Sequence, residues 1–190
     1  MALMELFFRR PTPEAVVKEH GPAVLRQLRR IFGPRADIDD VYQAVFVEVI
    51  RSLPSFAGRS NLKTWVHRIT LNVAYQEMRL SYRSKGHSEL DEEDPALTVE
   101  GDPESAATSR QAMEQLYQAL EALDPKKRIA VVLHDIEDKP LREVAEILGR
   151  PLQTVASQVR SGRAELAERL LEQAKPEGAR EGRERQGGGR

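Results

Sequence analysis

The residues best suited to chemistry in this chain are hydrogen-bonding and basic side chains gathered around a glycine-centred loop. Arg59, Ser60 and Asn61 stand just before a segment that carries Lys63 and Arg68. Guanidinium, hydroxyl and amide groups in a loop can hydrogen-bond an unstacked base, and the basic side chains that follow can neutralise phosphates. The pattern therefore indicates contact with a nucleic-acid strand.

The tryptophan in this segment has two interpretations. Trp65 is the only tryptophan of the chain and stands at the start of the expected helix. It can stack on a base, but its large apolar area more often packs in a core, so we expect it mainly to anchor the loop. Asn72 lies at helical spacing from Arg68 and can contact a strand from the same side, and Arg79 adds a further positive charge.

A second group of polar side chains lies in residues 141–155 and the helix that follows, where the spacing is that of a helix-turn-helix. Gly149 suits a left-handed residue that ends the first helix, and Pro151 blocks its continuation. The second helix is expected to begin at Gln153 or Thr154. Its polar face can reach base edges and phosphates from the major groove, although an ordinary helical hairpin with a polar outside is the alternative. The candidate contacts are Gln153, Thr154, Ser157, Gln158, Arg160, Ser161 and Arg163.

Composition restricts the class of protein. A chain of 190 residues allows one ordinary domain or two small ones, and 40% hydrophobic with 31% charged residues favours small helical units with wide solvated faces. The 29 basic and 30 acidic side chains exclude a uniformly basic nucleic-acid binder, so contacts must come from local clusters. The absence of cysteine excludes thiolate zinc sites and is consistent with a reducing cytoplasm.

The elements that must position these groups are helices, because apolar residues repeat at helical spacing almost everywhere. Pro22 is placed for the first turn of one helix, which should end before Pro34. Asp37 or Asp39 can cap the next helix, and a third should run over about residues 62–83. The second helix repeats the apolar residues Val41, Val45, Phe46, Val49 and Ile50.

An acidic segment separates two helical halves. Residues 85–104 contain one positive and eight negative charges, interrupted by prolines and a glycine, which predicts a flexible linker or simply a solvated spacer. We therefore predict an all-α protein with two small helical domains, residues 11–83 and 105–172, joined by a flexible acidic linker at 84–104. The second domain contains the helix-turn-helix. The Gly/Arg/Glu-rich tail at 175–190 is expected to be disordered.

The second predicted helix has an acidic start. Asp39, Asp40 and Gln43 would occupy an exposed face able to pair with a basic partner, while Phe46 packs near it. A capped amphipathic helix without a partner would look the same.

Together these segments resemble the extracytoplasmic-function sigma factors, the minimal members of the bacterial sigma-70 family. The resemblance rests on residues 37–46, 56–69 and 141–155, which occur in the family's order and spacing. It implies that Asp39, Asp40, Gln43 and Phe46 dock on core RNA polymerase. It also implies that the loop and helix at 56–79 recognise and melt the minus-ten promoter element, and that the helix-turn-helix reads the minus-thirty-five element.

The resemblance has further implications and some departures. It implies promoter DNA and an anti-sigma factor as additional partners, and a linker that threads into the cleft of polymerase. The family usually has an arginine where Gln158 stands. Thr70-Leu71 and Gln76-Glu77 also replace positions that commonly include an arginine and an aspartate.

Other functions fit the sequence less well. The four histidines lack metal spacing and phosphate-loop glycines are missing, so we expect no enzyme activity, no cofactor and no metal. A helix-turn-helix transcriptional regulator that acts without core polymerase is the main alternative. No stretch approaches the roughly 18 apolar residues of a membrane span, so we expect no insertion into a lipid membrane and a cytoplasmic location.

Overall fold

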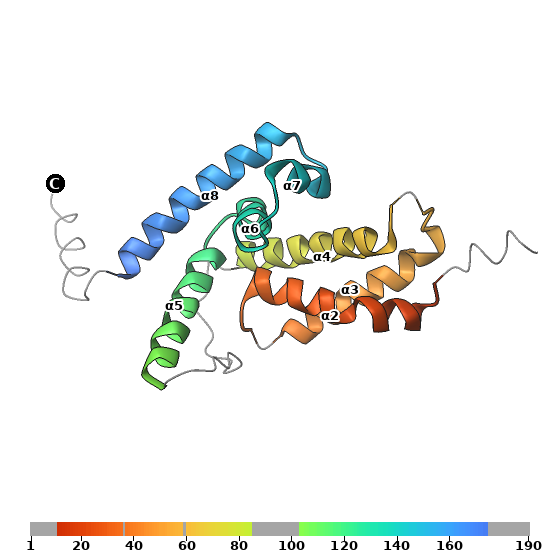
Figure 1. Ribbon diagram of the computed structural model, residues 1–190, viewed down its shortest axis with the longest axis horizontal. Coiled ribbons are helices and arrows are strands. Elements are labelled where there is room, and N and C mark those ends of the chain that lie inside the picture. Colours follow the sequence, from red (N-terminus) through yellow and green to blue (C-terminus); the bar gives the residue numbers. More distant parts are fainter. Residues whose placement is uncertain (1–10, 36, 59, 85–102, 175–190) are drawn as a thin grey trace, which may run out of the picture. The chain divides into compact units, whose positions relative to one another are not determined.

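The computed structural model describes residues 11–35, 37–58, 60–84 and 103–174. Within these residues every regular element is helical, which confirms the all-α prediction. The chain divides into two compact units, residues 1–94 and 95–190 (Figure 1). Most of the predicted linker and the whole of the predicted tail lie outside the described residues.

The first unit is built from three helices: α2 (Pro13–Phe32), α3 (Ile38–Ser52) and α4 (Leu62–Ser84), with a short 3-10 turn, η1 (Leu53–Ser55), after α3. Each of the three helices packs against the other two (Figure 1). Their apolar stripes meet in one core, which is how amphipathic helices gain most of their stability. Large apolar side chains with no exposed surface in this core are Val16, Leu28, Ile31, Val45 and Val49.

The prediction that Pro22 lies in the first turn of a helix is wrong. Helix α2 begins nine residues earlier at Pro13, and the Oγ1 atom of Thr12 accepts a hydrogen bond from the N–H of Ala15 at 3.3 Å. Pro22 lies inside the helix, where packing of the buried Val24 and its neighbours outweighs the lost backbone donor. The helix ends as expected before Pro34, with Gly33 at φ 74°.

An ion pair stabilises the connection from α2 to α3. Asp37 occupies the capping position of α3, but its side chain makes no capping hydrogen bond. Instead, the guanidinium of Arg35 donates to both carboxylate oxygens of Asp37 and lies 4.7 Å from the centre of the Phe32 ring. The hydrogen bonds from Arg35 hold the pKa of the Asp37 carboxyl below its ordinary value of 3.8.

The second unit contains α5 (Pro103–Glu121), α6 (Pro125–Val131), a π-helical turn η3 (Val132–Ile136), α7 (Leu141–Leu148) and α8 (Leu152–Gln173). Helix α8 packs on α5, α6 and α7. Two helix starts differ slightly from the predicted ones. Helix α5 begins at Pro103, inside the predicted linker, and α8 begins at Leu152 rather than at Gln153 or Thr154. The most deeply buried side chains are Leu120, Leu123, Ile129, Val132, Leu133, Val144 and Val155.

Helices α6 and α8 approach each other closely at Gly162. A β-carbon at Gly162 would lie 2.7 Å from Val131 Cγ2 and 3.4 Å from Lys127 Cβ. Glycine is therefore the residue that lets α8 lie directly on α6 at this point. Leu166 and Leu170, which follow Gly162 by four and eight residues on α8, are half-buried.

Candidate nucleic-acid interface

The loop before α4 is closed by an aromatic pair and a helix cap. The rings of Phe56 and Trp65 have centroids 5.0 Å apart and are tilted by 49°. The side-chain oxygen of Asn61 accepts a hydrogen bond from the N–H of Thr64 at 2.7 Å, so Asn61 caps α4. Gly58 has φ 65°, a conformation that favours glycine. Of the predicted loop contacts, Ser60 is half-buried, Asn61 is exposed, and Arg59 lies outside the described residues.

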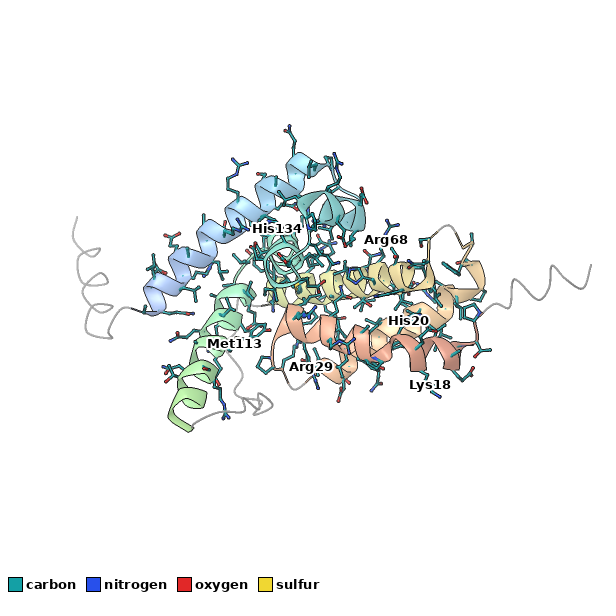
Figure 2. All side chains as sticks on the ribbon, in the orientation of Figure 1. Lys18, His20, Arg29, Arg68, Met113 and His134 are labelled. Carbon is teal, nitrogen blue, oxygen red and sulfur yellow. The ribbon has the colours of Figure 1, made fainter. Side chains whose placement is uncertain are left out.

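Helix α4 collects three of the predicted strand contacts on one exposed face. Arg68, Asn72 and Arg79 are all exposed and lie within roughly 40° of one another at 100° per residue. Figure 2 shows Arg68 on the side of α4 away from α2. Lys63 is exposed too, but lies roughly 140° around the helix axis from Arg68. The structure therefore brings Arg68, Asn72 and Arg79 together and leaves Lys63 on another flank.

The opposite face of α4 is fixed to the core. Gln27 of α2 is buried, and its Nε2 atom lies 3.4 Å from His67 Nε2. Thr70 has no exposed surface, and its hydroxyl donates to the carbonyl of Val66 at 3.0 Å. Leu71 is buried as well, so this departure from the family pattern falls on core residues.

The predicted docking residues lie in the first three turns of α3. Asp39, Asp40 and Gln43 are exposed. Phe46 is buried, and its ring packs against that of Tyr42 with centroids 5.0 Å apart. The three polar groups are thus exposed on α3, while the ring of Phe46 is buried beside Tyr42.

The same surface has an apolar continuation that sequence reasoning missed. Val47 is 67% exposed and Ile50 is 43% exposed. They follow Gln43 by four and seven residues, so they extend its stripe along α3. The apolar repeat that includes Ile50 favoured its burial, and Val47 was not singled out. Only the position of the neighbouring helices shows that both side chains face outward.

The helix-turn-helix is formed as predicted. Helix α7 ends at Gly149, which adopts the left-handed conformation at φ 62° and ψ 36°. The N–H of Arg150 then donates to the carbonyl of Ala145 at 3.0 Å, which closes the turn. Val144 and Ala145 are buried, as a close crossing of two helices requires.

The predicted contacts on α8 separate into two sets. Gln153, Thr154, Ser157 and Arg160 are exposed on the first three turns. Gln153, Ser157 and Arg160 lie within roughly 60° of one another around the axis. Thr154 lies roughly 100° around the axis from Gln153, so it borders the face that the other three side chains share.

The remaining predicted contacts on α8 bond within the unit. Gln158 is half-buried, and its Oε1 atom accepts a hydrogen bond from Arg150 Nη1 at 3.2 Å. Ser161 is half-buried, with its hydroxyl 3.5 Å from Glu165 Oε1. Arg150 was missed by sequence reasoning, because nothing in its position in the turn indicates that it reaches Gln158.

Arg163 is bound to Asp135. Its Nε atom lies 2.9 Å from Asp135 Oδ2 and 3.1 Å from Oδ1, and its Nη2 atom also contacts Oδ1. These hydrogen bonds to Asp135 raise the pKa of the Arg163 guanidinium above its ordinary value. The side chain predicted to meet the DNA backbone is thus already part of a two-point ion pair.

In the described parts of the chain, no three histidine, aspartate or glutamate side chains are grouped to hold a metal ion. No helix in those same parts is both long and apolar enough to cross a membrane.

The fold and these faces define a two-module helical protein whose second module is a helix-turn-helix. Sigma-70 region 2 matches residues 16–84, and Sigma-70, region 4 matches residues 113–166. The chain belongs to the sigma-70 family.

Curated relatives point to one branch of that family. The chain is 31% identical over 160 residues to the ECF RNA polymerase sigma factor SigE of Mycolicibacterium smegmatis, across 84% of this chain and 62% of the relative. It is 29% identical over 133 residues to the ECF RNA polymerase sigma-E factor of Escherichia coli, across 66% of this chain and 70% of the relative. The chain thus spans less than two thirds of the mycobacterial relative.

Solved structures share the fold. CnrH, in complex with the cytosolic domain of CnrY, aligns with a TM-score of 0.56 at 25% identity, over 86% of this chain and 89% of CnrH. The sigma factor RpoE, in complex with the anti-sigma factor NepR from Bartonella quintana, aligns with a TM-score of 0.58 at 23% identity. That alignment covers 84% of this chain and 96% of RpoE.

Proposed function

We propose that this chain is an alternative sigma factor that binds core RNA polymerase and directs promoter recognition, DNA melting and transcription initiation. The observation that carries the proposal is the presence of both sigma-70 regions, in family order, on two separate helical units. The chain supplies binding surfaces for this task, and the chemistry of RNA synthesis belongs to polymerase. No enzyme activity, cofactor or metal of its own is required.

The first unit would carry the minus-ten function. Arg68, Asn72 and Arg79 form an exposed face on α4, and Asn61 and Ser60 lie in the loop that leads into it. Arginine can follow a phosphate backbone, and polar loop groups can hold a base that has left the stack. Arg59 and Lys63 complete the set that we assign to this element. Capture of single-stranded bases stabilises the open duplex without any covalent step.

The α3 surface would dock on core polymerase. Asp39, Asp40 and Gln43 provide charge and hydrogen bonding, and the exposed Val47 and Ile50 provide apolar area beside them. A mixed surface of this kind suits a protein interface, in which apolar side chains contribute affinity and charges contribute orientation and association rate. We assign Phe46 a supporting role beneath the surface.

The second unit would read the minus-thirty-five element with α8. The exposed groups on its first turns are an amide, two hydroxyls and a guanidinium, which can pair with base edges in the major groove. Gln153, Thr154, Ser157 and Arg160 are therefore the best placed contacts. Gln158 and Ser161, which bond within the unit, are assigned secondary roles.

An anti-sigma factor is the further partner that we propose. RpoE is described in complex with the anti-sigma factor NepR. The exposed apolar side chains on α3 and the polar face of α4 are surfaces that such a protein could cover. The inhibited protein would then be unable to reach polymerase or DNA.

Gel-shift assays on promoter-containing duplexes, with and without core polymerase, test the proposal. We expect a specific complex only when chain and core are both present. Asp39→Asn combined with Asp40→Asn should weaken the binding of core, whereas Arg68→Ala combined with Arg79→Ala should preserve core binding and reduce promoter opening. Arg26→Ala, an exposed arginine on α2, is the matched control. Tight, specific binding by the chain alone would instead favour a regulator that acts without polymerase.

A further inference from the structure

Two ion pairs hold α8 to the α6–η3 segment. Helix α8 supplies the positive group of one pair and the negative group of the other. Arg163 of α8 binds Asp135 of η3 through two nitrogens, while Glu165 of α8 accepts from Lys127 of α6. The partners are 28 and 38 residues apart in sequence. Gly162 directly precedes Arg163 in α8 and lets the helix backbone approach Val131.

This arrangement fixes both the rotation and the register of α8. A shift of α8 by one helical turn would separate both pairs, and a rotation would turn Gly162 away from Val131 and place a larger residue there. The exposed Gln153, Ser157 and Arg160 lie one to three turns before the two ion pairs on the same helix. Their direction is therefore set by contacts that they do not make themselves.

We propose that Arg163 is a positioning residue of the helix-turn-helix, which acts with Asp135 to aim the outward face of α8, and that it does not contact a DNA phosphate. The inference rests on the proposed function and deepens it. A guanidinium that neutralises Asp135 adds no net positive charge for DNA, and Asp135 is the less exposed partner at 26% against 56%. The π-helical turn presents the carboxylate at this point, and His134 of the same turn donates from Nδ1 to the Lys139 carbonyl at 2.7 Å.

The two roles predict opposite effects of removing Asp135. If Arg163 binds phosphate, Asp135→Asn removes a negative charge near DNA, frees the guanidinium and should raise affinity. If Arg163 is a positioning residue, the same change loosens α8 and lowers affinity. The salt dependence separates the roles again, because loss of one phosphate contact reduces the slope of log affinity against log salt by about 0.9.

The test uses holoenzyme assembled from core polymerase and the full chain, on a promoter duplex recovered by run-off transcription. Fluorescence anisotropy over a series of potassium chloride concentrations gives affinity and slope for Asp135→Asn, Arg163→Gln and the double variant. Arg160→Gln, which changes an exposed arginine on the same helix, is the matched comparison. Thermal unfolding of each free chain reports whether α8 is loosened.

We expect either single change to lower affinity on the order of tenfold with an unchanged slope, and the double variant to be no worse than either. The reversed pair, Asp135→Arg with Arg163→Asp, should restore binding. Higher affinity for Asp135→Asn, or a slope reduced by about 0.9 for Arg163→Gln, would overturn the inference. So would a reversed pair that unfolds at the original temperature but does not bind. If the unsubstituted chain forms no promoter complex with core, the proposed function itself fails.

Discussion

The indole ring of Trp65 packs on the ring of Phe56, with centroids 5.0 Å apart. This contact joins the residue after η1 to the first turn of α4, so it closes the loop that carries Ser60 and Asn61. Trp65 is only half-buried, yet its partner is a protein ring. The geometry supports an anchoring role for Trp65.

Loosening this pair should disturb the loop without unfolding the unit. Phe56→Leu keeps an apolar side chain but removes the ring contact, and we expect a loss of about 1 kcal/mol. Because Trp65 is the only tryptophan, its fluorescence reports the change directly, as a shift to longer wavelength. Opening of the minus-ten element should weaken in parallel. Unchanged emission in a variant with impaired opening would assign Phe56 a different role.

Asn61 should have two separable roles. Asn61→Ala removes the cap of α4 and should cost about 1 kcal/mol, whereas Asn61→Ser retains a capping oxygen and should cost little. Both changes remove the amide that we assign to the base. We therefore expect both to reduce binding of single-stranded minus-ten DNA by holoenzyme, but only the first to lower the unfolding temperature.

Thr12→Ala is the control for this pair of variants. It removes the equivalent cap of α2 in the same unit and should match Asn61→Ala in stability. It should leave DNA binding intact. If Thr12→Ala impairs binding as much as Asn61→Ala, the effect of Asn61 is one of stability.

Gly162→Ala should destabilise the second unit. The added methyl group would lie 2.7 Å from Val131 Cγ2, and overpacking of this kind costs about 1–3 kcal/mol. Calorimetry of the full chain should show a lower transition temperature for the second unit only. Val131→Ala combined with Gly162→Ala should recover part of the loss, and an additive double variant would argue against a direct clash.

The Arg35–Asp37 pair should make the first unit sensitive to acid. Because Arg35 lowers the pKa of Asp37 below 3.8, the pair stabilises the folded chain above about pH 4 and loses its effect as the pH falls through the lowered pKa. Asp37→Asn should thus be less stable than the original chain at pH 7, with a difference that shrinks below pH 4. The carboxylate is half exposed, so screening by 1 M salt should also reduce the difference.

Denaturant titrations at several pH values measure this effect. Arg35→Gln, which removes the other partner of the same pair, should lose stability at pH 7 and converge with the original chain below pH 4 in the same way. A gap between Asp37→Asn and the original chain that persists to pH 2 would mean that the stabilisation does not come from the charge of the Asp37 carboxylate.

Periodicity was sufficient to place the helices, because most buried positions repeat at helical spacing. The turn at Gly149 was equally predictable, since glycine and a following proline leave few alternatives. The start of α2 was not predictable, because Pro13 and Pro22 both suit a first helical turn. The helix begins at Pro13 because the residues between the two prolines pack in the core. Tertiary packing of this kind leaves no local mark in the sequence.

The sequence indicated which polar residues to consider for the site, but it predicted less well which of them are exposed together on one surface. Sequence spacing grouped Arg68 with Asn72, and the exposed face of α4 agrees. It could not show that Arg163 pairs with Asp135, or that Gln158 bonds Arg150, because those contacts join segments whose distance depends on the whole unit. The exposure of Ile50 could not be predicted for the same reason, because it depends on where the neighbouring helices lie.

Run-off transcription from genomic fragments, with purified core polymerase and this chain, tests the central claim most directly. We predict discrete transcripts that require the chain, start at defined positions and disappear with Arg68→Ala combined with Arg79→Ala, while Arg26→Ala leaves them intact. Specific binding of the chain alone to duplex DNA, with no chain-dependent transcript from any fragment, would contradict the account.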